Sequence, residues 1–245
     1  MVDLVEDTWF EAGHVAIVTG ASRGLGKELA RELLAHGLQV VIDGRDSGVL
    51  EEARRELARH GDVIAIAGDV NDDGHTHALV DAAKQLGRLD VLVNNASTLG
   101  AVPLPRIDEL TRSAFRELFD VNVFAPIHLI QHALPLLQRS PVATIVNVTS
   151  DAGVEAYPTW GGYGSTKAAL EHVSRVLSIE LEGTTVRVLV ADPGDMNTQM
   201  HRDAIPDADP STLRDPADSA RALLRAIAEM PGRFARIRLA ELATV

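Results

Sequence analysis

The chain has 245 residues, of which 46% are hydrophobic and 24% charged, and its formal net charge is −12. This length suits one large domain or two small ones, and the acidic balance disfavours nucleic acid as a partner. The chain has no cysteine, which excludes a disulfide framework and thiolate chemistry. The first residues are acidic rather than basic-then-apolar, and no apolar run reaches the roughly 18 residues of a membrane span. We therefore expect a cytoplasmic protein with no membrane partner and no nucleic-acid partner.

Short apolar runs alternate with helical patterns along the chain. Strands are predicted at 15–18, 40–42, 63–66, 91–93, 144–148 and 186–190, with a weaker one at 236–239. Helices are predicted at 25–36, 48–60, 73–86, 111–137, 163–181 and 216–229, and the fourth of these is interrupted or bent near Pro126. Val/Ile/Leu strands that alternate with helices indicate a parallel sheet covered on both faces. The expected fold is α/β, a doubly wound parallel sheet (Rossmann fold) in a single domain over residues 1–245.

Two segments fall outside this alternation. Residues 1–13 precede the first strand and are expected to form an N-terminal arm. Residues 195–215 form the one long irregular stretch, rich in Pro, Asp and Ala. Because a loop of this length in a compact domain is usually functional or mobile, we expect it to be the substrate-binding loop.

A glycine-rich turn separates the first strand from the first helix, with Gly20, Gly24 and Gly26 in the run TGASRGLG. Glycines allow a tight turn and a close approach of the backbone to a pyrophosphate, which then rests on the helix N-terminus. The spacing is G-x-x-x-G-x-G, and a lone glycine turn is weak grounds for a ligand site. The strand before it and the helix after it favour a dinucleotide site over a plain turn.

The chain has only two tyrosines and three lysines, and Lys167 stands four residues after Tyr163. On a helix this spacing puts both side chains on one face. An ammonium beside a phenol lowers the pKa of the phenol, so Tyr163 could donate and accept a proton near neutral pH. Tyr157 has Gly161 at the same spacing and cannot play this part. The alternative is a solvated helix face with an incidental pair.

The nine histidines form no zinc signature in the sequence. His75 and His77 would be a poor ligand pair on a helix, because residues i and i+2 diverge. We expect the histidines to be surface or packing residues and expect no metal site.

Together these motifs resemble the short-chain dehydrogenase/reductase family, from about His14 to Glu229. The matching residues are Thr19-Gly20 with Gly24 and Gly26, Asp69-Val70, Asn94-Asn95-Ala96, Asn122, Ser150, Tyr163 with Lys167, and Pro193-Gly194 with Thr198. They occur in the family's order, and Ser150 precedes Tyr163 by the family's usual interval. The resemblance implies a catalytic tetrad of Asn122, Ser150, Tyr163 and Lys167.

The resemblance also implies a role for each member of the tetrad. Tyr163 would be the general acid in reduction and the general base in oxidation, with Lys167 lowering its pKa and binding the nicotinamide ribose. Ser150 would orient the substrate carbonyl, and Asn122 would anchor a proton relay. The expected enzyme is an oxidoreductase that interconverts a ketone or aldehyde and an alcohol on a small organic substrate.

The end of the second strand bears on the choice between NADP and NAD. An acid about 20 residues past the glycines accepts the ribose of NAD, whereas a nearby arginine holds the 2′-phosphate of NADP. Asp43 stands one residue before the family's acid position, which Gly44 occupies, and successive strand residues point to opposite faces. Arg45 and Arg23 could pair with the phosphate, or be ordinary surface arginines. We favour NADP over NAD.

The full set of expected ligand residues follows from the same resemblance. The cofactor residues are Gly20, Ser22, Arg23, Gly24, Leu25, Gly26, Arg45, Asp69, Val70, Asn95, Ala96, Ser97, Tyr163, Lys167, Pro193, Gly194 and Thr198. The expected substrate residues are Asp151, Tyr157, Trp160 and Met196.

Two of these residues depart from the family pattern. Ser97 replaces a glycine, and its side chain could crowd the cofactor or donate a hydrogen bond near it. Asp151 could bind a polar substrate group or cap the following turn.

The expected assembly is a homodimer or homotetramer. Two alternatives stay open: an NAD-dependent alcohol dehydrogenase of the same family, and a non-catalytic NADP-binding regulatory protein.

Overall fold

The computed structural model describes residue 10 and residues 12–242. Most of the expected N-terminal arm, residues 1–9 and 11, lies outside the described residues, as do residues 243–245.

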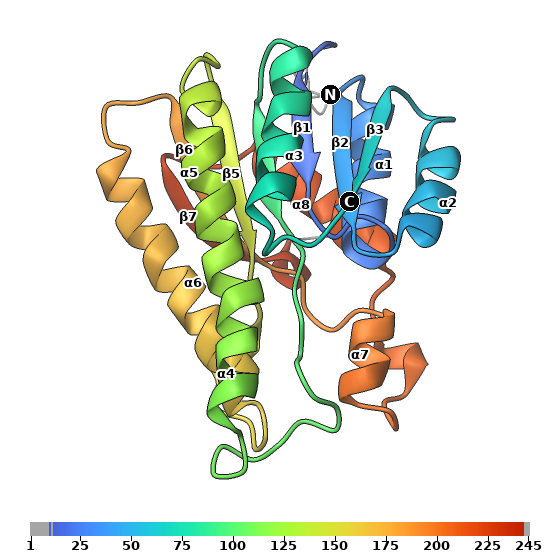
Figure 1. Cartoon of the computed structure of the whole chain (residues 1–245), viewed down its shortest axis with the longest axis vertical. Coiled ribbons are helices and arrows are strands. Elements are labelled where there is room, and N and C mark those ends of the chain that lie inside the picture. Colours follow the sequence, from blue (N-terminus) through green and yellow to red (C-terminus); the bar gives the residue numbers. More distant parts are fainter. Residues whose placement is uncertain (1–9, 11, 243–245) are drawn as a thin grey trace, which may run out of the picture.

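The centre of the molecule is one seven-stranded parallel sheet in the order β3-β2-β1-β4-β5-β6-β7 (Figure 1). Its strands are β1 (Val15–Val18), β2 (Gln39–Gly44), β3 (Val63–Ala67), β4 (Val91–Asn94), β5 (Ala143–Val148), β6 (Val186–Asp192) and β7 (Phe234–Arg238). Ile17 of β1 pairs with Val41 of β2 on one side and Leu92 of β4 on the other. The order reverses between β1 and β4, which is the switch point of a doubly wound sheet. The expected fold class and single domain are confirmed.

Helices cover both faces of the sheet. They are α1 (Gly24–Ala35), α2 (Ser47–Leu57), α3 (Asp73–Gln85), α4 (Arg112–Phe119), α5 (Ala125–Leu137), α6 (Gly161–Glu180), α7 (Gln199–Ala204) and α8 (Pro216–Ala228). Ala16 and Val18 pack toward the side of α1 and α8, whereas Val15 and Ile17 pack toward α3 and α5. This alternation explains why β1 is apolar without interruption, because successive side chains enter different cores.

The fourth predicted helix is interrupted, as expected, just before Pro126. A π-helical segment, Asp120–Phe124, separates α4 from α5, and Pro126, which has no backbone N–H to donate to the preceding turn, lies in the first turn of α5. Single π-helical turns inside α-helices are frequent at functional sites. This one carries Asn122, whose side chain is buried.

The stretch at 195–215 is not irregular throughout, which corrects the expectation. It contains α7 and a short 3-10 turn at Pro210–Thr212, and an isolated parallel bridge joins Met196 to Arg214. The hydroxyl of Thr198 accepts a hydrogen bond from the backbone of His201 and so caps α7. A helix of six residues is too short for a recognisable apolar period. In Figure 1, α7 lies apart from the layers that cover the sheet.

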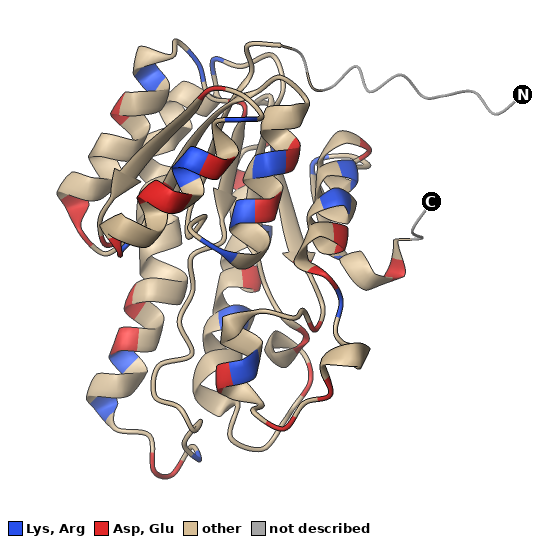
Figure 2. Ribbon diagram, turned by 90° about the vertical axis from the view of Figure 1, so that its right-hand side faces the viewer, with Lys and Arg blue, Asp and Glu red and all other residues tan. Residues whose placement is uncertain are grey.

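Charged residues concentrate on the helices and loops, and the interior strands carry few of them (Figure 2). Among the described residues, no helix has the length and apolar character needed to cross a bilayer.

Candidate active site

The expected site residues gather at one edge of the sheet because they follow parallel strands. Thr19 follows β1, Asn95 follows β4, and Pro193 follows β6, while Ser150 stands two residues beyond the end of β5. The carboxyl ends of parallel strands meet at the same edge, and ligands of open α/β sheets bind there at the switch point. The predicted cofactor and catalytic motifs are therefore brought to one edge of the sheet.

The glycine turn is packed so closely that two of its positions accept no side chain. Gly20 has a φ of +64°, and a Cβ there would lie 2.8 Å from the Cα of Ala96. A Cβ on Gly26 would lie 2.5 Å from the Nδ2 of Asn95. That Nδ2 donates a hydrogen bond to the carbonyl of Thr19 at 2.8 Å. Glycine at these two positions therefore lets the turn pack against Asn95 and Ala96, which follow β4.

Asp43 supports the glycine turn from below. Its side chain is 1% exposed and accepts a hydrogen bond from the backbone N–H of Gly20 at 2.6 Å. Its other oxygen lies 3.0 Å from the Nε2 of His75. Both carboxylate oxygens are therefore engaged in the interior, and Asp43 does not point toward a ribose, in keeping with its strand position.

A glycine and two exposed arginines stand near Asp43, at the end of β2 and in the glycine turn. Gly44 offers no carboxylate, and a Cβ on it would lie 3.1 Å from the Cβ of Ser22. Arg23 and Arg45 are both exposed, so their guanidinium groups are accessible at the turn between β1 and α1 and at the end of β2. A guanidinium pairs with phosphate through a bidentate fork.

The remaining motifs predicted to bind the cofactor border the same edge. Asp69 is exposed, and its carboxylate accepts a hydrogen bond from the backbone of Asn71. Gly194 has a φ of +71° and donates its N–H to the carboxylate of Asp192. Thr198 reaches the glycine turn, because a Cβ on Gly24 would lie 3.4 Å from the Cγ2 of Thr198. The segment after β6 thus lies against the turn after β1.

Tyr163 and Lys167 share a face of α6, as predicted. Tyr163 is 7% exposed and Lys167 is 2% exposed. The Nζ of Lys167 lies 5.4 Å from the centre of the Tyr163 ring and donates a hydrogen bond to the carbonyl of Val148 at 2.9 Å. The pair is therefore buried rather than solvated, which rules out the incidental surface pair.

The acid–base properties of this pair differ from the sequence-based expectation. Burial raises the pKa of Tyr163, a hydrogen bond with Ser97 lowers it, and the carboxylates of Asp192 and Asp151 raise it again. Burial lowers the pKa of Lys167 to about 8, and Glu171 opposes this shift. Lys167 does not bring the phenol toward neutral pH in this structure, because burial dominates and its ammonium bonds to Val148. At neutral pH, Tyr163 is a protonated phenol.

Ser97 links two members of the expected tetrad, which sequence reasoning missed. Its hydroxyl donates a hydrogen bond to the Oδ1 of Asn122 at 2.9 Å and is hydrogen-bonded to Tyr163. The Nδ2 of Asn122 donates to the carbonyl of Thr98 and to the hydroxyl of Thr166. The only signal in the sequence is that a serine stands where the resembling family has glycine.

Ser150, Asp151 and Tyr157 form a second hydrogen-bonded group. The hydroxyl of Ser150 donates to one oxygen of Asp151 at 3.0 Å, and the Tyr157 hydroxyl donates to the other at 2.9 Å. Ser150 itself caps the following turn by accepting from the backbone of Ala152, so the capping role considered for Asp151 belongs to Ser150. Asp151 fixes both hydroxyls, which the sequence did not predict.

An apolar collar surrounds the Tyr163 side chain. The Trp160 ring meets the Tyr163 ring edge-on at 5.7 Å between centroids. The other members of the collar are Leu99, Leu104, Ala152 and Ala204. Ala204 belongs to α7, so the segment at 195–215 does reach Tyr163. Met196, in contrast, packs against the hydrophobic core on the α1 and α8 side and is not part of this collar.

A cleft of about 350 Å³ opens beside this group. Its lining residues are Asp151, Glu155, Tyr157, Asp192, Gly194, Asp195, Arg238 and Ala240. Four of them are carboxylates and one is a guanidinium, so the walls of the cleft carry a negative charge.

Comparison with known proteins agrees with this geometry. A family model described as short chain dehydrogenase matches residues 14–209. A rhamnolipid-biosynthesis 3-oxoacyl-[acyl-carrier-protein] reductase of Pseudomonas aeruginosa is 37% identical over 215 residues, which cover 85% of this chain and 81% of that protein.

Solved structures of related proteins have the same fold as this chain. A 7α-hydroxysteroid dehydrogenase, complexed with NADH and 7-oxo glycochenodeoxycholic acid, is 27% identical, with a TM-score of 0.83 over 94% of this chain and 95% of its own. A Shigella flexneri protein complexed with NADP is 25% identical, with a TM-score of 0.85 over 94% of this chain and 98% of its own. The two structures hold different nicotinamide cofactors, so the likeness leaves NADP and NAD equally open.

Proposed function

The chain belongs to the short-chain dehydrogenase family, and from this premise we propose that it is an NADP(H)-dependent oxidoreductase that interconverts a small ketone or aldehyde and the corresponding alcohol. The observation that carries the proposal is the meeting of a buried tyrosine–lysine pair with a closely packed glycine turn at one edge of the sheet. Family membership makes the protein an oxidoreductase, whereas the cofactor, the substrate and the residue roles are our inference.

Proton transfer is assigned to Tyr163. Because burial raises its pKa, the phenol holds its proton at neutral pH and is suited to donate it to the oxygen of a carbonyl that is being reduced. The bound nicotinamide supplies the hydride in this direction and accepts it in the other. Lys167, mostly charged below its pKa of about 8, stabilises the phenolate that the transfer leaves behind.

Two further residues position the reacting groups. The hydroxyl of Ser150 would orient the substrate carbonyl by turning from the carboxylate of Asp151, its partner in this structure. Asn122 would hold Ser97 in place, because its Oδ1 accepts a hydrogen bond from the Ser97 hydroxyl. After Tyr163 has given up its proton, the Ser97 hydroxyl would pass its own proton to Tyr163 and take another from water.

The preference for NADP rests on three positions. Arg23 and Arg45 would pair with the 2′-phosphate, whereas Gly44 offers no carboxylate to a ribose. The buried carboxylate of Asp43 is hydrogen-bonded to Gly20 and paired with His75. It therefore would not face the 2′-phosphate and repel it. The pyrophosphate would rest on the turn at Gly20 to Gly26, with the nicotinamide beside Pro193, Gly194 and Thr198.

Equilibrium titration of protein fluorescence with NADPH and with NADH tests this preference. We expect NADPH to bind at least about tenfold more tightly, and we expect the Arg45→Ala and Arg23→Ala substitutions to weaken NADPH binding while NADH binding stays the same. Arg139→Ala is the matched control, because Arg139 is exposed but lies just past the C-terminal end of α5. Equal affinity of the unsubstituted protein for both cofactors would instead favour an NAD-dependent alcohol dehydrogenase.

The surroundings of Tyr163 favour an uncharged carbonyl substrate. The apolar collar would pack on the carbon groups of the substrate, whereas the four carboxylates of the cleft would repel an anion. A 2-oxoacid and its methyl ester form a matched pair of probes. We expect kcat/KM with NADPH to be at least about tenfold higher for the ester, and an equal or higher value for the acid would contradict this assignment.

The same assays address the other open possibilities. Tight NADPH binding with no turnover across neutral ketones and aldehydes would favour a non-catalytic regulatory protein. Homodimer or homotetramer assembly, cytoplasmic placement and the lack of a nucleic-acid partner remain predictions.

A further inference from the structure

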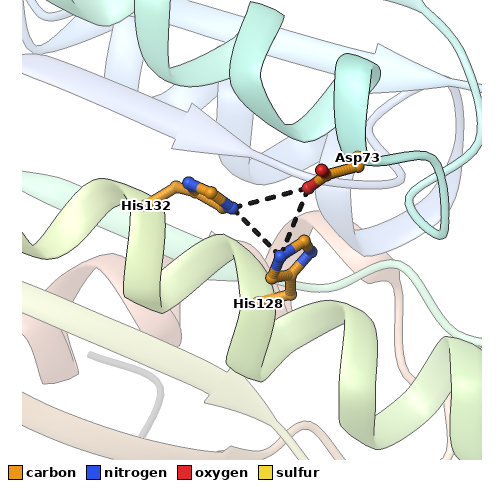
Figure 3. Close-up of side chains that lie close together, drawn as sticks. All are labelled: Asp73, His128 and His132. Carbon is orange, nitrogen blue, oxygen red and sulfur yellow. Dashed lines mark hydrogen bonds and ion pairs between the residues drawn. The ribbon is translucent and has the colours of Figure 1, made fainter.

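Three side chains that the proposed reaction does not use converge on the outer surface between α3 and α5 (Figure 3). His128 and His132 stand one turn apart on α5, and Asp73 is the first residue of α3. The two helices pack against each other, so residues more than fifty positions apart in the sequence become neighbours. We call these three residues the His–His–Asp cluster.

The spacing of the cluster is that of a set of metal ligands. The Nε2 atoms of His128 and His132 lie 3.0 Å apart. The Oδ1 of Asp73 lies 3.3 Å from the Nε2 of His128 and 3.5 Å from that of His132. A tetrahedral ion with bonds of about 2.0–2.1 Å holds its ligand atoms roughly 3.4 Å apart. One ion could therefore contact all three atoms with little movement of the side chains.

A third imidazole lies against the cluster, because the Nδ1 of His77 is 3.6 Å from the Oδ1 of Asp73. The His77 ring packs against the His132 ring at a tilt of 54°, with centroids 4.0 Å apart, and its Nδ1 is 2.7 Å from the backbone carbonyl of Asp73. Without a cation, three imidazoles crowd around a single carboxylate.

We propose that His128, His132 and Asp73 bind a divalent transition-metal ion, Zn²⁺ by the chemistry of the donors. Two imidazole nitrogens and one carboxylate oxygen are donors that Zn²⁺ accepts in tetrahedral sites, with water in the fourth position. Mg²⁺ and Ca²⁺ fit poorly, because they select oxygen ligands. This site departs from the sequence-based expectation that the histidines only pack or face solvent.

The position of the ion would make it a clamp between two helices rather than a catalytic centre. It would tie the N-terminus of α3 to α5, and α5 continues directly from the π-helical segment that carries Asn122. A ligand that binds only the folded protein raises its stability by mass action. Zinc should therefore stabilise the packing of α3 on α5 without entering the proposed reaction.

Calorimetric titration of the tag-free, chelator-treated full chain with Zn²⁺ tests the site. We expect one ion per chain with micromolar affinity, and a rise in Tm of roughly 5–10 °C when Zn²⁺ is at about a hundred times Kd. We expect His128→Ala, His132→Ala and Asp73→Asn each to weaken binding by about tenfold or more. Titration with Co²⁺ should produce the visible absorption of a tetrahedral site, and this absorption should disappear in the His128→Ala/His132→Ala variant.

His172→Ala is the control, because His172 is an exposed histidine on α6, away from the half-buried His128 and His132 on α5. It should bind Zn²⁺ as the unsubstituted protein does. Each variant is checked for an unchanged Tm in the presence of chelator, so that lost binding cannot be attributed to unfolding. Absence of binding below millimolar Zn²⁺ would overturn the proposal, as would binding that survives removal of both histidines.

Discussion

Burial sets the protonation of the two residues at the centre of the proposed reaction. The Lys167 ammonium lies in the interior with one hydrogen bond, to a backbone carbonyl, and its pKa falls to about 8. An unfolded lysine keeps its proton to a pKa near 10.4. Charged Lys167 therefore costs stability at neutral pH, and this cost is relieved when the folded protein releases the proton above pH 8.

This cost predicts a pH dependence of stability. Between about pH 8 and 10.4 the unfolded chain binds more protons at this lysine than the folded one, so the free energy of unfolding rises with pH. Relative to the Lys167→Met variant, the unsubstituted protein should gain about 2 kcal/mol between roughly pH 7.5 and 9.5. Urea unfolding of both proteins at the two pH values measures the gain. Parallel pH profiles would show that Lys167 is not buried in its charged form.

Ser97 provides a second prediction at the residue scale. Ser97→Gly removes the hydroxyl that joins Tyr163 to Asn122, and with it an interaction that lowers the pKa of Tyr163. We expect kcat to fall by about tenfold at saturating NADPH and the pH profile of alcohol oxidation to move to higher pH. Ser97→Thr keeps a hydroxyl and should retain most activity. An unchanged oxidation profile in Ser97→Gly would mean that the hydroxyl has no part in proton transfer.

At the scale of elements, the end of β2 holds the glycine turn in place. The carboxylate of Asp43 contacts the backbone N–H of Gly20 and the imidazole of His75 in α3. Gly68 leaves room for that imidazole, since a Cβ on Gly68 would lie 2.2 Å from the Nδ1 of His75. A strand, a turn and a helix are therefore coupled through one buried carboxylate. Its loss would leave a buried N–H and an imidazole unpaired, which costs roughly 1–3 kcal/mol for each group.

Comparing two variants isolates this support. Asp43→Ala should lower Tm by roughly 5–10 °C and weaken the binding of NADPH and NADH alike, because the turn is no longer held. His75→Ala should lower Tm but leave NADPH affinity within about threefold, because Asp43 still accepts from Gly20. If Asp43→Ala selectively improved NADPH binding over NADH binding, Asp43 would be a ribose ligand and this account of the turn would be wrong.

Helices and strands were predicted well from the sequence where a single local pattern of residues was enough to locate them. The unbroken apolar runs at 15–18 and 91–93 located the central strands β1 and β4, and the i, i+4 spacing placed Tyr163 and Lys167 on one face. β7 was placed two residues late because all of its residues are half-buried and show no clear period. The sequence did not predict contacts between residues that only the tertiary fold brings together. Among them are the contacts of Ser97 with Asn122, of Asp151 with Tyr157, and of Asp73 with the histidines of α5.

At the scale of the whole molecule, the π-helical segment and α6, which lie beside α4, expose large apolar side chains. Phe124 is 55% exposed and Ile179 is 70% exposed, and Phe115, Phe119 and Phe124 form a row of ring contacts. These helices lie side by side on the same flank of the sheet (Figure 1). Such residues on a chain with a net charge of −12 suit an interface between copies.

We therefore predict a homodimer or homotetramer by light scattering after size exclusion. Placing glutamate at both positions, Phe124→Glu with Ile179→Glu, should shift the protein to a smaller assembly. Val142→Glu is a matched control, because Val142 is 39% exposed but lies in the turn before β5. A chain that is monomeric before substitution would contradict the expected assembly.

The central claim is that Tyr163 supplies the proton for an NADPH-dependent carbonyl reduction. Its most direct test is the rate of NADPH oxidation with a neutral ketone, measured for the unsubstituted protein and for Tyr163→Phe, together with the NADPH affinity of each. The account predicts a loss of kcat of about a thousandfold or more with NADPH affinity within about threefold. A Tyr163→Phe variant that turns over at a near-normal rate would contradict it.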